Sequence, residues 1–144
     1  MKPLVLAIVL AVFTAFGVGP AAASNDDERL FVVVTSPDPQ IQSMAMVLSI
    51  QARKRGAPVR MLLCGPGADL ALKGAPQTAL KPRGATPQGM LSTLIGMGVT
   101  AEVCALYLPN NGKSPADLID GVGVAKPPAI ASVIVEDDTK LFTF

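Results

Sequence analysis

Hydrophobic residues along the chain form short continuous runs that alternate with stretches of helical spacing. The run 30–35 is apolar and β-branched, which predicts a strand buried on both faces. Asp38 followed by Pro39 predicts the start of a helix, and Gly56 its end. The apolar residues between them recur on one helical face, so we expect them to be buried: Ile41, Met44, Ala45, Leu48 and Ala52.

The same alternation continues to the C-terminus. A second strand is expected at 59–63, a third within 98–108 with Cys104 midway along it, and a closing strand at 141–144. Signals for the start of a helix occur at Thr86-Pro87, Ser114-Pro115 and Pro127 or Pro128. A short helix is also expected at 68–73, and the composition of 74–85 predicts an exposed loop. Strands that alternate with helices predict a small three-layer α/β domain with a mainly parallel sheet.

Residues 1–23 have the pattern of a secretory signal peptide. Lys2 precedes an uncharged apolar run at 4–18, and Ala21-Ala22-Ala23 fits a small-residue cleavage site. An apolar run of about 15 residues is shorter than the roughly 20 that span a bilayer, which favours a cleaved signal over an anchor. We therefore expect a periplasmic or secreted protein in which 24–144 form one domain with no membrane segment.

The composition excludes several classes of function. The chain has no histidine and no tryptophan, so histidine-based triads, acid–base pairs and histidine metal sites are ruled out. Lys2 is the only charged residue of the signal peptide, and the mature chain then carries 11 basic and 11 acidic residues. Such a neutral chain lacks the basic surface of a nucleic-acid-binding protein. No cofactor is expected, because Gly65-Pro66-Gly67 lacks the lysine and hydroxyl of a phosphate-binding loop.

The two cysteines are the candidate reactive groups. A thiolate at Cys104 could attack a persulfide or polysulfide and hold its terminal sulfur. Cys64 ends the second strand, and the N-terminus of the helix after it could stabilise a thiolate. The alternative for both is inert packing in the core. If the first strand lies between the other two, the cysteines are about 10 Å apart, beyond the roughly 7 Å limit for the Cα atoms of a disulfide.

Two other features are candidates for binding. Tyr107, the only tyrosine, lies near the exit of the third strand and could line a site or an oligomer contact. The methionines and cysteines could together bind Cu(I), which prefers soft sulfur ligands. Core filling is the preferred interpretation of the methionines in the predicted apolar segments, so no metal site is predicted: Met44, Met61, Met90 and Met97.

The order of these elements resembles the DsrE/DsrF-like family over essentially the whole mature chain. The resemblance is carried by the stretch Leu63 to Gly74, by Gly98-Val99 before Val103-Cys104, and by a last helix that runs into 140–144. It implies a small flavodoxin-like α/β domain that assembles into trimers or hexamers. It also implies that the cysteine at the position of Cys104 accepts and passes on sulfur as a persulfide.

Two hypotheses of function follow. In the first, the chain is an exported sulfur carrier, at most a cysteine-dependent sulfurtransferase, with Cys104 as the catalytic residue and Cys64 and Tyr107 as binding residues. Its partners would be a sulfur donor or acceptor protein or a small sulfur compound. In the second, the chain is a non-catalytic oligomeric binding module of the same fold, and Cu(I) binding is a minor third option.

Overall fold

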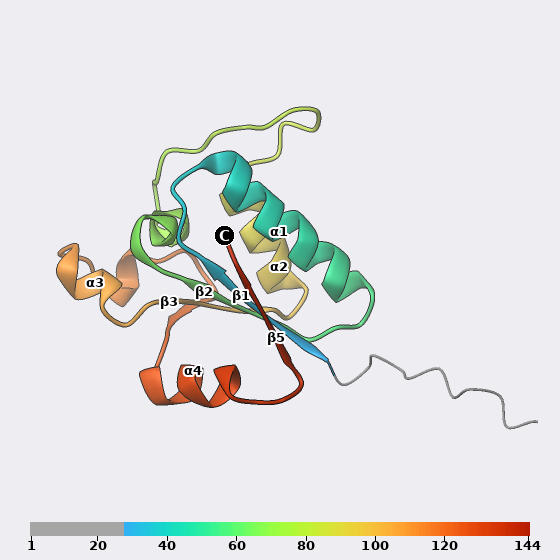
Figure 1. Cartoon of the computed structure of the whole chain (residues 1–144). Helices are drawn as coiled ribbons and strands as arrows, with labels where there is room; N and C mark the ends of the chain where they lie inside the picture. Colours follow the sequence, from blue (N-terminus) through green and yellow to red (C-terminus); the bar gives the residue numbers. More distant parts are fainter. Residues whose placement is uncertain (1–27) are drawn as a thin grey trace, which may run out of the picture.

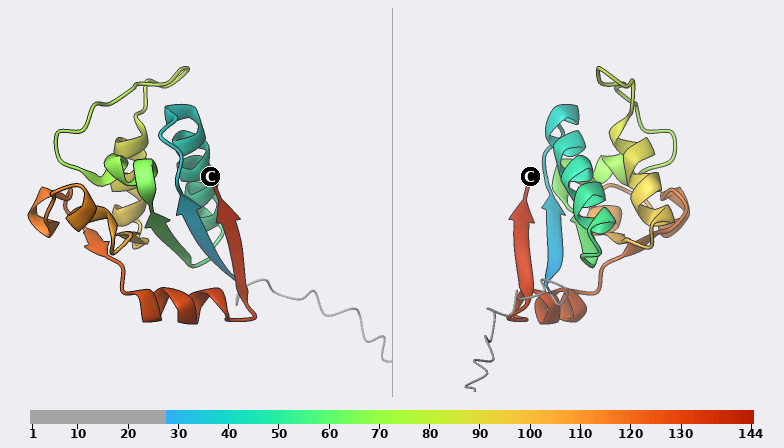
Figure 2. Two further views of the ribbon diagram at one scale, coloured as in Figure 1. Left: turned by 60° about the vertical axis from the view of Figure 1, so that its left-hand side comes forward. Right: turned by 90° about the vertical axis from the view of Figure 1, so that its right-hand side faces the viewer.

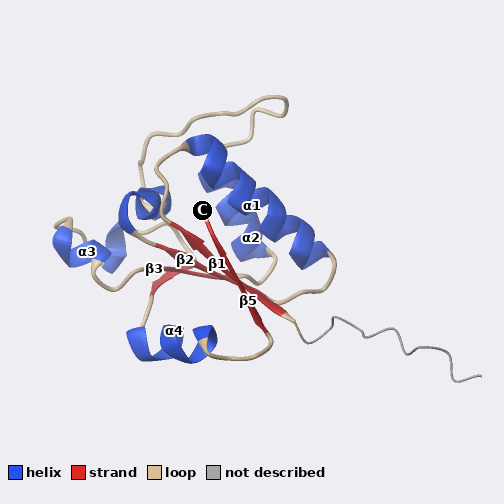
Figure 3. Cartoon of the chain, in the orientation of Figure 1, coloured by secondary structure: helices blue, strands red, loops and turns tan. Residues whose placement is uncertain are grey.

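The computed structural model describes residues 28–144, and the predicted signal peptide lies outside the described residues. Within them, strands and helices alternate as the hydrophobic pattern predicts (Figure 3). The strands are β1 (Arg29–Val34), β2 (Val59–Leu63), β3 (Thr100–Val103), β4 (Val122–Val124) and β5 (Thr139–Thr143). The α-helices are α1 (Pro39–Lys54), α2 (Pro87–Gly96), α3 (Tyr107–Asn110) and α4 (Pro127–Ile134), and two 3₁₀ helices are η2 (Gly65–Ala71) and η3 (Pro115–Asp117).

The five strands form one sheet in the order β4-β3-β2-β1-β5, and every neighbouring pair is parallel. Helices α1 and α2 cover one face of this sheet and α4 lies on the other (Figure 1). The predicted three-layer α/β fold is therefore confirmed.

The strand order corrects one expectation from the sequence, because β2 and not β1 lies beside β3. Connections through α1 and α2 run over the same face, so right-handed crossovers add β2 and then β3 on the same side of β1. The connection through α4 runs over the opposite face and returns the chain to the free side of β1, where β5 pairs (Figure 2).

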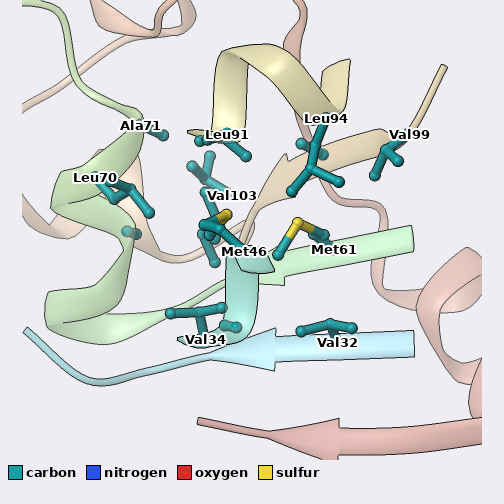
Figure 4. Packing of buried hydrophobic residues seen from close by; sticks show 14 of the residues in the cluster. Val32, Val34, Met46, Met61, Leu70, Ala71, Leu91, Leu94, Val99 and Val103 are labelled. Atoms are coloured by element: carbon teal, nitrogen blue, oxygen red, sulfur yellow. The ribbon is translucent and has the colours of Figure 1, made fainter. Parts of the chain in front are cut away.

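The largest core cluster lies between the sheet and the α1–α2 layer, and Met46 and Met61 are fully buried within it (Figure 4). At the start of α1 the Asp38 carboxylate accepts hydrogen bonds from the Gln40 and Ile41 amides at 2.8 and 3.1 Å, as an N-cap does.

The buried face of α1 differs from the predicted one. Ile41, Met44 and Leu48 are 43%, 52% and 47% exposed, although Ala45 is buried as expected. The residues that face the core are Gln42, Ala45, Met46 and Ser49. The two polar members of this face are satisfied inside the protein, since Gln42 donates to the Ser36 carbonyl and Ser49 to the Ala45 carbonyl. The prediction of the buried face of α1 from hydrophobicity alone is therefore wrong.

Three smaller differences concern the segment after Cys104. Strand β3 ends at Val103, so Cys104 follows the strand instead of lying midway along it, and the chain then turns into α3. The segment 121–124, for which no strand is predicted from the sequence, contains β4. The helix expected at Ser114-Pro115 is the single 3₁₀ turn η3, in which Ser114 and Asp117 form a capping box. None of the helices among residues 28–144 combines the length and the apolar character needed to span a membrane.

Candidate functional site

The strand order brings the two cysteines side by side at the carboxyl edge of the sheet. Leu63 pairs with Val103 at the end of the β2–β3 ladder, and each cysteine is the next residue of its strand. The Cys104 amide still donates to the Leu63 carbonyl at 2.9 Å, so the two chains remain paired at this point. Neighbouring strands are about 4.8 Å apart. The expected separation of about 10 Å is therefore wrong, and both thiols are free.

Both cysteines border the α4 side of the sheet, as the alternation of side chains along a strand predicts, and Cys104 also packs against the larger cluster on the α1–α2 side. Leu63 and Val103 belong to the core cluster on the α1–α2 side. Cys64 packs against the smaller cluster on the α4 side, whose buried members are Phe31, Leu62, Ala125, Ile130 and Val133.

Cys104 lines an apolar pocket of about 320 Å³ between the edge of the sheet and α4. This volume is near the lower end for small-molecule sites, about 300 to 1,000 Å³, and suits a short sulfur chain or the tip of a partner's side chain. No charged side chain lines the pocket, and its other lining residues are Leu62, Ala105, Leu106, Ala125, Pro127, Ile130, Ala131 and Ile134. The Cys104 sulfur is therefore the one nucleophile in its wall.

The surroundings of Cys64 keep its proton in place. Burial, and after it the side-chain and charge interactions with Cys104, raise the pKa of Cys64 from 9.0 to about 12. This direction is opposite to the stabilised thiolate expected from the following helix N-terminus. The helix η2 does begin at Gly65, but the Cys64 side chain makes no capping hydrogen bond. Near neutral pH, Cys64 is thus a protonated thiol beside Cys104.

Tyr107 connects the segments that follow the two cysteines. Its side chain is 6% exposed, and its hydroxyl donates to Asp69 in η2. Burial, then this hydrogen bond and the charge of Asp69, raise the pKa of Tyr107. The Tyr107 amide donates to the Cys104 carbonyl at 2.9 Å. Tyr107 is not among the residues that line the pocket. Because it contacts both Asp69 and Cys104, it holds the two cysteine-bearing segments together.

A second and larger hollow lies on the other side of the sheet. This groove, of about 920 Å³, runs between α1, α2 and the loop 79–85. Met44, Met90 and Met97 line it together with Lys54, Lys81 and Arg83. The sequence did not indicate it, because the prediction placed Met44 in the core.

Among residues 28–144, no three or more His, Cys, Asp or Glu side chains gather where a metal ion could bind.

The wall of the cysteine pocket was also missed from the sequence. Residues such as Leu106, Ile130 and Ile134 look like ordinary apolar core or surface positions in the chain. Only the packing of α4 below the ends of β2 and β3 places them around Cys104. The one signal that the sequence carried for this site was the presence of two cysteines, on the second and third predicted strands.

No family model matches the chain, and no curated protein matches it. Solved structures do match. The crystal structure of the YchN protein from E. coli superposes with a TM-score of 0.63 at 22% identity, covering 81% of this chain and 99% of that one. The protein MTH1491 from Methanobacterium thermoautotrophicum, described as of unknown function, gives a TM-score of 0.60 at 17% identity with the same coverage. At these identities the similarity establishes a shared fold.

Proposed function

We propose that this chain is an exported sulfur carrier of the DsrE/DsrF-like family that holds a persulfide on Cys104. One observation carries the proposal: Cys104 is the single nucleophile in the wall of an apolar pocket at the carboxyl edge of the sheet, and a second thiol lies beside it. In parallel α/β sheets, ligands bind at this edge. The sequence resemblance and the fold shared with YchN and MTH1491 are consistent with this assignment.

The loading step is a thiolate–persulfide exchange. The Cys104 thiolate attacks the terminal sulfur of a donor persulfide, which is a small molecule or a cysteine persulfide of a partner protein. A bond forms between Cys104 Sγ and that sulfur, the sulfur–sulfur bond of the donor breaks, and the donor leaves as a thiolate. The same step in reverse, with an acceptor thiolate, unloads the carrier. The residues that line the pocket with Cys104 are apolar.

Export and self-assembly are part of the proposal. Cleavage after Ala23 would leave a mature chain that begins at Ser24 and works in the periplasm or outside the cell. A trimer or hexamer is supported by the apolar residues that α1 and β5 leave exposed: Ile41, Met44, Val47, Leu48, Leu141 and Phe142. Nucleic acids are not expected as partners, because the mature chain has no net charge.

Intact-protein mass spectrometry after exposure to polysulfide tests the carrier function. We expect the Cys64→Ser variant to gain the mass of one sulfur atom and Cys104→Ser to gain none, because only Cys104 faces the pocket as a nucleophile. Circular dichroism of both variants checks that the fold is retained. Equal sulfur uptake in Cys104→Ser, or no uptake on either thiol with the fold intact, would refute the proposal.

A second candidate function is the non-catalytic binding module. The observation that favours it is the groove between α1, α2 and the loop 79–85, which is larger than the cysteine pocket and does not involve either cysteine. Its methionines can adapt to the shape of an apolar ligand, and its basic side chains could pair with an acidic group of that ligand. If polysulfide leaves both thiols unmodified, this groove becomes the candidate binding site of the protein.

A further inference from the structure

The two cysteines are placed so that they can form a disulfide. They are consecutive to the paired residues Leu63 and Val103 on adjacent parallel strands. The spacing of adjacent strands, about 4.8 Å, lies within the range of about 4.4 to 6.8 Å between the Cα atoms of a disulfide. Cys64 packs against the cluster on the α4 side of the sheet, and Cys104 lines the pocket on that same side. This arrangement needs no movement of one strand past the other.

We propose that Cys64 is a resolving thiol, which forms a disulfide with Cys104 and releases the sulfur held there as hydrogen sulfide. This inference rests on the proposed function, because it concerns the fate of the persulfide on Cys104. It adds a second activity to the carrier: the reduction of a bound sulfane sulfur to sulfide, with the two cysteines as the source of electrons.

The step balances with the groups that the protein and the loading reaction supply. The terminal sulfur of the Cys104 persulfide takes the proton of Cys64, the resulting Cys64 thiolate attacks Sγ of Cys104, and a bond forms between the two cysteine sulfurs. The bond between Cys104 Sγ and the terminal sulfur breaks, and its electron pair leaves with that sulfur. The departing sulfur, which carries the proton from Cys64, leaves as hydrosulfide. The pair of cysteines loses two electrons, and an external dithiol reductant returns the disulfide to two thiols.

The pKa of Cys64 is raised first by burial and then by its interactions with Cys104. At neutral pH Cys64 is therefore a thiol, and only its thiolate can attack a sulfur atom. The charged terminal sulfur of a persulfide on Cys104 is the base next to Cys64 that can take this proton.

The surrounding contacts hold the two thiols at this separation. The Cys64 amide donates to the Val34 carbonyl and the Cys104 amide to the Leu63 carbonyl, both at 2.9 Å. Beyond the cysteines, the hydrogen bond from Tyr107 to Asp69 joins the two chain segments again. The pair is thus fixed on both sides. The chain has no third cysteine, so Cys64 is the only internal thiol that can resolve a persulfide on Cys104.

The test compares the lifetime of the persulfide in the reduced wild-type protein and in Cys64→Ser. Both are loaded with polysulfide, excess donor is removed, and samples are quenched by alkylation at intervals for intact-mass and sulfide measurements. In the wild type we expect the added sulfur to disappear while one sulfide is released per loaded chain. The product should lack two hydrogens and yield a peptide pair linked between Cys64 and Cys104. In Cys64→Ser we expect the added sulfur to last at least about tenfold longer, since an internal thiol acts at a high effective concentration.

Two controls keep the outcomes apart. Val135→Ser replaces a residue that is 77% exposed and outside the pocket, and it should behave as the wild type does. Cys64→Ala repeats the main comparison in case the serine disturbs packing. Equal lifetimes in the wild type and in both Cys64 variants, with sulfur on Cys104, would overturn this inference and leave the carrier function standing. Absence of sulfur uptake in every form would overturn both.

Discussion

Cys64 and Cys104 carry the same functional group in different surroundings. Cys104 borders an apolar pocket, whereas Cys64 packs against the cluster on the α4 side and lies next to the other thiol. The rise in the pKa of Cys64 comes first from that burial. In the proposed function these surroundings correspond to different roles: Cys104 carries the sulfur, and Cys64 is the thiol that can resolve the persulfide.

The raised pKa of Cys64 predicts a loss of stability at alkaline pH. The unfolded chain releases this proton near pH 9.0 and the folded chain near pH 12, so the folded state binds more protons between these values. The free energy of unfolding contributed by Cys64 is then fully present below about pH 9 and is lost as the pH rises towards 12. We expect urea unfolding of the reduced wild type to weaken over this window more steeply than that of Cys64→Ser.

The difference between the two proteins is the quantity to measure. Tyr107 also has a raised pKa and contributes a loss in the same direction, but it does so equally in both proteins. Parallel stability curves for wild type and Cys64→Ser between pH 9 and pH 11 would contradict the prediction.

At the scale of elements, the helix η2 is packed directly on the end of β1. The Gly67 amide donates to the Thr35 carbonyl at 3.0 Å. A Cβ atom at Gly67 would lie 2.5 Å from the Val34 carbonyl oxygen, which is a backbone atom and cannot rotate away. Because Cys64 immediately precedes η2, this close approach also helps to fix the position of the cysteine.

Gly67→Ala should therefore destabilise the protein. We expect a loss of about 1 to 3 kcal/mol in the free energy of unfolding, since β1 or η2 must shift to admit the methyl group. Gly96→Ala is the matched control, because a Cβ there meets nothing within 4 Å at the end of α2. Alanine should leave stability unchanged or raise it by up to about 1 kcal/mol at that position. Equal effects of the two substitutions in urea unfolding would show that η2 moves freely.

Across the whole molecule, α1 and the edge strand β5 leave apolar side chains uncovered. Leu48 and Phe142 are 47% and 45% exposed and line the same hollow between α1 and β5. Exposed apolar groups that gather in one area mark interaction surfaces in soluble proteins. This face of the monomer is where we expect copies of the chain to meet in the proposed oligomer.

Sedimentation velocity of the mature chain checks this expectation. Leu48→Lys combined with Phe142→Lys should convert the oligomer to monomers, because two buried charges without partners oppose association. The circular dichroism spectrum should not change, since both side chains are at the surface of the monomer. Val135→Lys introduces a charge at another exposed apolar site and should leave the assembly intact. An oligomer that survives the double substitution would place the interface elsewhere.

The sequence by itself determined the class of fold and indicated a candidate reactive group. The apolar run at 30–35 and the helix starts at Asp38-Pro39 and Thr86-Pro87 are local signals that the structure confirms. Such signals depend on short-range hydrogen bonding and on the spacing of apolar residues, which can be read along a chain. The absence of histidine left cysteine as the candidate for covalent chemistry.

The tertiary structure alone decided which elements are neighbours. The order of strands depends on the faces over which α1, α2 and α4 cross the sheet, and no local pattern encodes that choice. The observed strand order puts Cys64 next to Cys104, and the packing of α4 below the ends of β2 and β3 forms the pocket. The tertiary structure also turned Ile41, Met44 and Leu48 of α1 outward, because the packing of α1 on the sheet and α2 selected a face with satisfied polar groups. The site of this protein is thus a product of contacts between segments far apart in the chain.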